Sequence, residues 1–61
     1  MMSRSDYVLI AKVINETFIQ GGPIVRATCM IITDNLADEL ENDNAQFDRD
    51  RFIAACLKEN D

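Results

Sequence analysis

The sequence predicts an all-α fold, a small three-helix bundle made of a helix hairpin and a short C-terminal helix. Apolar residues recur at three- and four-residue spacing along most of the chain, which is typical of amphipathic helices. Only two breaks interrupt this spacing, the Gly21-Gly22-Pro23 cluster and the polar stretch from Glu41 to Gln46. Because the chain has 61 residues, it has room for one domain, residues 1–61.

The first helix is predicted from about Ser3 to Ile19. Ser3, followed three residues later by Asp6, resembles a capping box at its start. Gly21 or Gly22 is expected to end the helix in a left-handed conformation. The apolar side of this helix consists of Tyr7, Ile10, Ala11, Val13, Ile14 and Phe18.

The second helix is predicted from about Pro23 to Asp43, with the proline in its first turn. Asn44 is expected to end it in a left-handed backbone conformation. Residues 24–33 are rich in β-branched side chains, which favour a strand. A lone strand would have no partner in this chain, so a helix is the preferred interpretation. Its predicted buried ladder consists of Val25, Cys29, Ile32, Leu36 and Leu40.

The same segment carries apolar residues beyond that ladder, namely Ile24, Ala27, Met30 and Ile31. A helix that is apolar nearly all round must be covered on more than one side. Two interpretations stay open: the neighbouring helices cover all of it, or a second copy of the chain covers part of it. These four residues are therefore a predicted self-association surface.

The third helix is predicted from about Asp48 to Lys58. Asp48 is a favourable N-cap, and Phe47 and Phe52 have the spacing of a hydrophobic staple around it. Phe52, Ala55 and Cys56 are expected to form its buried side.

No catalytic, cofactor-binding or metal-binding site is predicted. The chain has no histidine, which removes the usual general base at neutral pH. Cys29 and Cys56 alone cannot form a closed zinc site, and we expect both to be reduced and buried. The acidic stretch from Glu41 to Asp50 lacks the central glycine of a calcium-binding loop.

Charge is distributed unevenly along the chain. The net charge is −5, the sum of +1 from residues 1–33 and −6 from residues 34–61. Binding to a phosphate backbone is therefore disfavoured. No signal peptide or membrane segment is recognisable, and a cytoplasmic protein is expected. Arg49 and Arg51 form a possible patch for a partner, although Arg51 could instead pair with Asp48 or Glu41.

These observations favour a non-catalytic protein-interaction module that associates with itself or with another protein. One alternative is a small DNA-binding regulator of the helix-turn-helix type. A second is an acidic protein that mimics nucleic acid and inhibits a host protein.

Two stretches carry a family resemblance: Asp6-Tyr7-Val8-Leu9-Ile10-Ala11, and the segment from Asp43 to Cys56. The chain resembles short proteins encoded by tailed bacteriophages, especially those of actinobacteria. These open with Asp-Tyr-x-x-Ile-Ala and close with Asp-Asn-Pro-x-Phe-Asp-x-x-Arg-Phe-x-x-Ala-Cys. Ala45 stands where that pattern has proline, which leaves the turn less constrained. The resemblance implies a phage or prophage origin and a location in the host cytoplasm, and it implies no activity.

Overall fold

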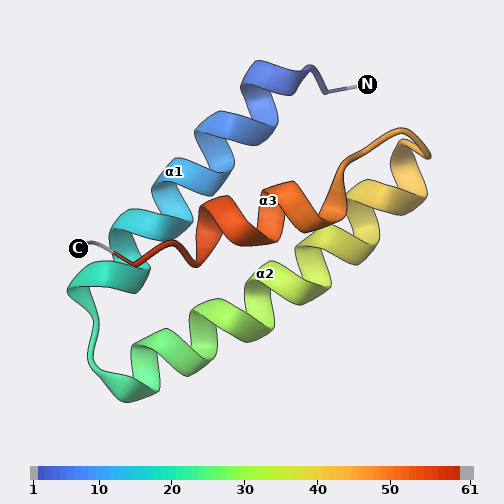
Figure 1. The fold of residues 1–61 in the computed structure, drawn as a ribbon. Coiled ribbons are helices and arrows are strands. Elements are labelled where there is room, and N and C mark those ends of the chain that lie inside the picture. Colours follow the sequence, from blue (N-terminus) through green and yellow to red (C-terminus); the bar gives the residue numbers. More distant parts are fainter. Residues whose placement is uncertain (1, 60–61) are drawn as a thin grey trace.

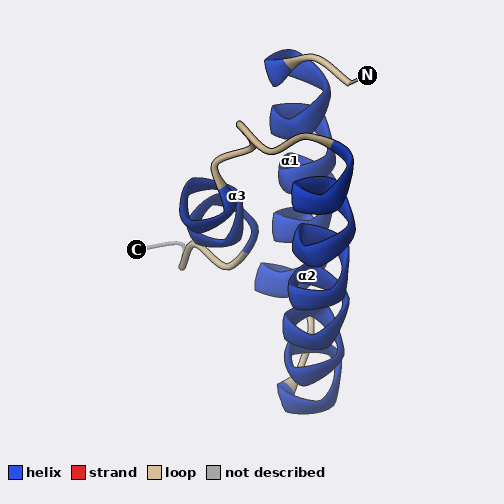
Figure 2. Cartoon of the chain, turned by 90° about the vertical axis from the view of Figure 1, so that its right-hand side faces the viewer, coloured by secondary structure: helices blue, strands red, loops and turns tan. Residues whose placement is uncertain are grey.

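The computed structural model describes residues 2–59, and in that range it contains three helices and no strand. They are α1 (Arg4–Gln20), α2 (Pro23–Asp43) and α3 (Arg49–Cys56). Helices α1 and α2 form an antiparallel hairpin (Figure 1). Helix α3 lies against one side of this hairpin (Figure 2). The predicted all-α three-helix fold is confirmed, including the helical conformation of residues 24–33.

Helix α1 begins as the sequence predicts and ends differently. The capping box is present: the Ser3 N–H donates to the Asp6 carboxylate at 2.9 Å. At the other end, Gly21 and Gly22 have φ values of −86° and −78°, so the predicted left-handed ending is wrong. Gly21 instead allows the Val25 side chain to approach the backbone closely. A Cβ atom at this position would lie 2.3 Å from Val25 Cγ1.

Helix α2 also ends without a left-handed residue, because Asn44 has φ −141°. The turn that follows is held by hydrogen bonds of this residue. The Asn44 side-chain oxygen accepts from the Gln46 N–H at 3.1 Å, and its backbone oxygen accepts from the Phe47 N–H at 2.9 Å. A side chain that bonds the backbone two residues ahead is a common way to fix a turn. The turn around Ala45 is therefore closed without a proline.

The core lies where the three helices meet, and small residues sit at its centre. Ala11, Ala37 and Cys56 have 2%, 0% and 0% of their surface exposed, so the helix backbones approach closely. Three aromatic rings pack together beside them: Phe47 lies 4.8 Å from Tyr7 and 5.3 Å from Phe52, between ring centroids. The other buried apolar residues are Phe18, Cys29 and Leu40.

The buried side of each helix is narrower than predicted. In α2 the buried residues are Cys29, Thr33, Ala37 and Leu40. Val25 and Ile32 of the predicted ladder are 41% and 50% exposed. Small and medium side chains occupy the buried side because α1 and α3 lie close there, and the bulkier β-branched residues point outward. Val13 of α1 and Ala55 of α3 are also exposed, contrary to prediction.

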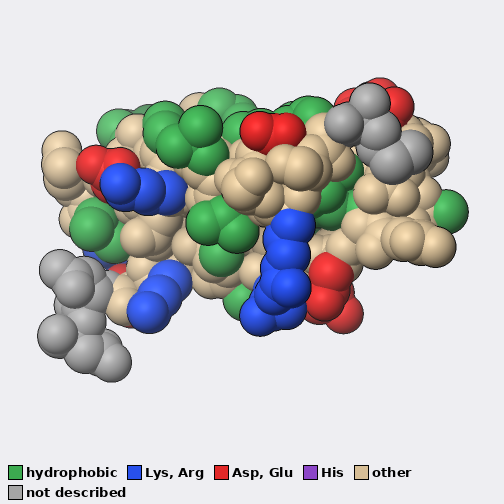
Figure 3. All heavy atoms as spheres, turned by 90° about the horizontal axis from the view of Figure 1, so that it is seen from above, with side chains coloured by type: hydrophobic (Ala, Val, Ile, Leu, Met, Phe, Trp, Pro, Cys, Tyr) green, Lys and Arg blue, Asp and Glu red, His purple; other side chains and the backbone are tan. Residues whose placement is uncertain are grey.

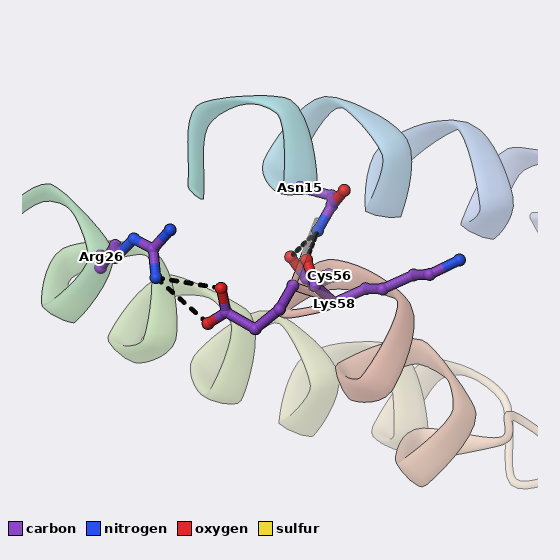
Figure 4. A network of polar contacts seen from close by, with 5 residues as sticks. Asn15, Arg26, Cys56 and Lys58 are labelled. Atoms are coloured by element: carbon purple, nitrogen blue, oxygen red, sulfur yellow. Dashed lines mark hydrogen bonds and ion pairs between the residues drawn. The ribbon is translucent and has the colours of Figure 1, made fainter. Parts of the chain in front are cut away.

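Polar side chains of two residues, one on each helix of the hairpin, fasten the end of α3 and the segment that follows it (Figure 4). From α1, the Asn15 side-chain nitrogen donates to the backbone oxygens of Cys56 and Lys58, at 3.1 and 2.8 Å. From α2, Arg26 pairs with Glu59 at 3.1 Å. The carbonyl groups at the end of a helix lack partners within the helix, so Asn15 satisfies one of them and holds α3 in place.

We expect the Gly21→Ala substitution to destabilise the fold by about 1–3 kcal/mol, because the added methyl group overlaps the stiff Val25 side chain. Gly22→Ala is the matched control, since nothing lies within 4 Å of its added Cβ. Urea unfolding followed by circular dichroism measures both. Equal stability of the two variants would contradict the close approach.

We expect Asn15→Ala to cost about 1–2 kcal/mol, because it removes two hydrogen bonds to backbone oxygens at the end of α3. Asn35→Ala, at an exposed position of α2, should change the free energy of unfolding by less than about 0.5 kcal/mol. Thermal unfolding compares the two variants. A cost for Asn15→Ala no larger than that for Asn35→Ala would show that these bonds do not hold the end of α3.

Candidate interaction surface

The hairpin exposes large hydrophobic residues on both of its helices. They are Val8, Leu9 and Val13 of α1, and Ile24, Val25, Met30, Ile31 and Ile32 of α2. We call these eight residues the hairpin surface. Single exposed apolar residues are normal on a folded protein, whereas a group of this kind marks an interaction site.

Much of the hairpin surface lies on the side that α3 leaves uncovered. In Figure 3, hydrophobic side chains gather along the upper edge of the molecule, away from α3. Leu9 and Val13 lie one helical turn apart on α1, and Val25 and Ile32 lie two turns apart on α2. None of these four residues lines either of the two hollows beside α3. The uncovered side therefore combines residues of both helices.

The four residues that the sequence predicts for self-association, Ile24, Ala27, Met30 and Ile31, are all exposed. Ile24, with 84% of its surface accessible, is the most exposed large hydrophobic residue of the hairpin surface. Met30 and Ile31 border a shallow hollow next to Ile53 of α3 and Leu57, which follows that helix. The set thus extends from the outer side of α2 to its border with α3.

Sequence reasoning missed the contribution of α1 to this surface. The spacing places Val13 on the buried side of the first helix and assigns Val8 and Leu9 to neither side. The exposure of Leu9 and Val13 follows from the number of helices. The described residues 2–59 form three helices, and α3 covers the other side of the hairpin.

The two arginines of the predicted partner patch have different surroundings. Arg49 of α3 forms ion pairs with Asp34, at 2.8 Å, and with Asp38, both on α2. Its hydrogen bond to Asp38 raises the pKa of Arg49 above its ordinary value. Arg51 is exposed and forms no ion pair with any residue from 2 to 59, so the predicted pairing with Asp48 or Glu41 is wrong. Only its backbone N–H contacts Asp48, at 3.1 Å.

Both cysteines are free and buried, as expected. Burial raises the pKa of the Cys56 thiol above its ordinary value, and the neighbouring Thr33 hydroxyl opposes that rise only in part. A thiol rather than a thiolate is therefore present at neutral pH, and the thiolate is the reactive form. Within residues 2–59 there is no cluster of three or more side chains suited to metal binding.

Comparisons with protein-family models, with curated proteins and with solved structures give no significant match to this chain. Among the described helices, none has the length and apolar character required to cross a bilayer.

We expect the Cys56 thiol to make the fold sensitive to alkaline pH. In the unfolded chain this thiol ionises near pH 8.5, and in the folded chain its pKa is higher. The contribution of the protonated thiol to the free energy of unfolding is complete below about pH 8.5. It is lost as pH rises through the folded pKa, because the unfolded state releases its proton first.

Between pH 7 and pH 10, the free energy of unfolding measured in urea should fall less for Cys56→Ala than for the parent chain. The Ala variant will be less stable at every pH, so the comparison rests on the slope with pH. Identical slopes would contradict the raised pKa.

Proposed function

We propose that this protein is a non-catalytic protein-interaction module that associates with a second copy of itself through the uncovered side of the hairpin. The supporting observation is the exposure of four large hydrophobic residues on that side, from 41% to 60% of their surface, on a hairpin covered by α3 on the other side. They are Leu9, Val13, Val25 and Ile32. In a dimer, the uncovered sides of two hairpins would pack against each other as a four-helix layer, with an α3 on each outer side.

The uncovered side supplies part of the apolar area that such a dimer needs. A stable interface buries about 800 Å² per partner, which is roughly a fifth of the 4441 Å² surface of this chain. A fully buried aliphatic side chain removes roughly 60–120 Å² from water. The four side chains, each about half exposed, therefore supply roughly 120–250 Å². Interfaces are somewhat more than half apolar, so these side chains supply roughly a quarter to a half of the apolar area, and the residues around them supply the rest.

Stability supports the same proposal. A chain of this length buries only about 60% of the surface that its unfolded form exposes. Small domains often gain the missing stability from oligomerisation, and a partner that binds only the folded state stabilises it further. The resemblance to short phage proteins adds a biological setting, that of an accessory factor acting in the host cytoplasm on itself or on a host protein.

The alternative functions have weaker support. A recognition helix in DNA needs several free arginine or lysine side chains for bases and phosphates, and the pairing of Arg49 with two carboxylates leaves Arg51 as the one unpaired basic residue within α3. A nucleic-acid mimic needs unpaired acidic residues in a regular array. Asp34 and Asp38 of the acidic half are both paired with that same arginine.

We expect the parent chain at 200–500 µM to scatter light with a mass about twice the 6.9 kDa of one chain. Ile32→Glu and Val13→Glu should each shift the mass toward that of the monomer, because a charge buried in an apolar interface is costly. Ala54→Glu adds the same charge at an exposed position of α3 and should leave the mass unchanged.

A strictly monomeric parent chain at 500 µM would rule out self-association. If Ala54→Glu dissociates the dimer as strongly as Ile32→Glu does, the interface lies elsewhere. Circular dichroism confirms that each variant remains folded.

A further inference from the structure

A groove runs between the N-terminal half of α1 and α3, at the opposite end of the core from the α1–α2 turn. Its volume is about 440 Å³, within the range of sites that bind small ligands or short peptide segments. Tyr7 and the buried Phe52 lie at its base. This groove is separate from the uncovered side of the hairpin, and residues of α3 form one of its walls.

The two walls of the groove carry the same pattern of side chains. On α1, Arg4 is followed one helical turn later by Val8, and on α3, Arg51 is followed one turn later by Ala55. Residues four apart lie on the same side of a helix. Each wall therefore offers one guanidinium group and one apolar contact to whatever lies between them.

Charge distinguishes this groove from the rest of the molecule. The chain carries a net charge of −5, whereas the charged residues that line the groove are Arg4, Arg51 and Asp48. Asp48 caps α3 by accepting from the Arg51 backbone N–H. Neither arginine forms an ion pair within the described part of the chain, so both guanidinium groups are available to an occupant.

We propose that this groove binds an acidic peptide segment of a partner protein, with an apolar side chain over Tyr7 and Phe52 and carboxylates on Arg4 and Arg51. Arginine is well suited to carboxylates because its planar group donates two parallel hydrogen bonds. The apolar base requires a side chain beside the carboxylates, and the protein-interaction role proposed above favours a peptide as the occupant. This inference specifies the chemistry of that partner and rests on the proposed interaction role.

The single tyrosine of the chain provides the measurement. Tyr7 lines the groove, and there is no tryptophan, so tyrosine fluorescence reports occupancy directly. The probe is the acetylated, amidated hexapeptide Glu-Asp-Leu-Ile-Asp-Glu, and the control peptide is Lys-Lys-Leu-Ile-Lys-Lys. At low salt we expect saturable binding of the acidic peptide with a sub-millimolar Kd, no binding of the basic peptide, and weaker binding as salt rises.

A pair of matched variants tests the two arginines. The double variant Arg4→Glu with Arg51→Glu should weaken binding at least tenfold. The double variant Lys12→Glu with Lys58→Glu makes the same change in net charge at exposed positions outside the groove, and should change binding less than threefold.

Three results would overturn the inference: no fluorescence change up to 5 mM acidic peptide, equal binding of the basic peptide, or equal losses in the two double variants. Displacement of the peptide by a thymidine hexanucleotide of higher affinity would instead assign the arginines to nucleic acid and overturn it as well. Light scattering on the same samples keeps this result separate from dimerisation, because peptide binding can fail in a chain that still associates.

Discussion

The length of α3 is the constraint on which the rest of the structure depends. An isolated helix of eight residues is unstable in water, because helix nucleation is costly and few hydrogen bonds follow it. Helix α3 therefore exists through its packing, with Phe52 and Cys56 buried against the hairpin. A helix this short also covers only one side of two helices that are 17 and 21 residues long. The same feature that closes the core leaves the other side of the hairpin exposed to solvent.

Polar contacts orient α3, while apolar burial stabilises it. Near its start, Arg49 joins it to Asp34 and Asp38 of α2, and at its end the Asn15 side chain of α1 donates to the Cys56 carbonyl oxygen. Exposed ion pairs add little free energy, so the Arg49 pairs chiefly fix direction and register. A helix fixed at both ends holds its remaining side chains in defined positions. Arg51 therefore faces α1 across the groove.

Local sequence signals predict the helices well and their surroundings less well. The capping residues Ser3 and Asp48 mark helix starts because their hydrogen bonds reach only three residues along the chain. The buried side of α2 depends on where α1 and α3 lie, which no local signal contains. Thr33 is fully buried and Ile32 is half exposed, although hydropathy favours the reverse. The sequence likewise predicts Gly21 as a left-handed helix end. The structure requires glycine there because Val25, four residues away, leaves no room for a Cβ atom.

The two proposed interactions differ in their physical origin, and salt separates them. Bringing two copies together places two net charges of −5 side by side, so their repulsion opposes a contact made by Leu9, Val13, Val25 and Ile32. Added salt screens that repulsion and strengthens apolar association. In the groove, attraction between Arg4 or Arg51 and carboxylates favours binding, and added salt weakens it. One salt series followed by both scattering and tyrosine fluorescence should therefore give opposite trends. Parallel trends would mean that both signals come from a single surface.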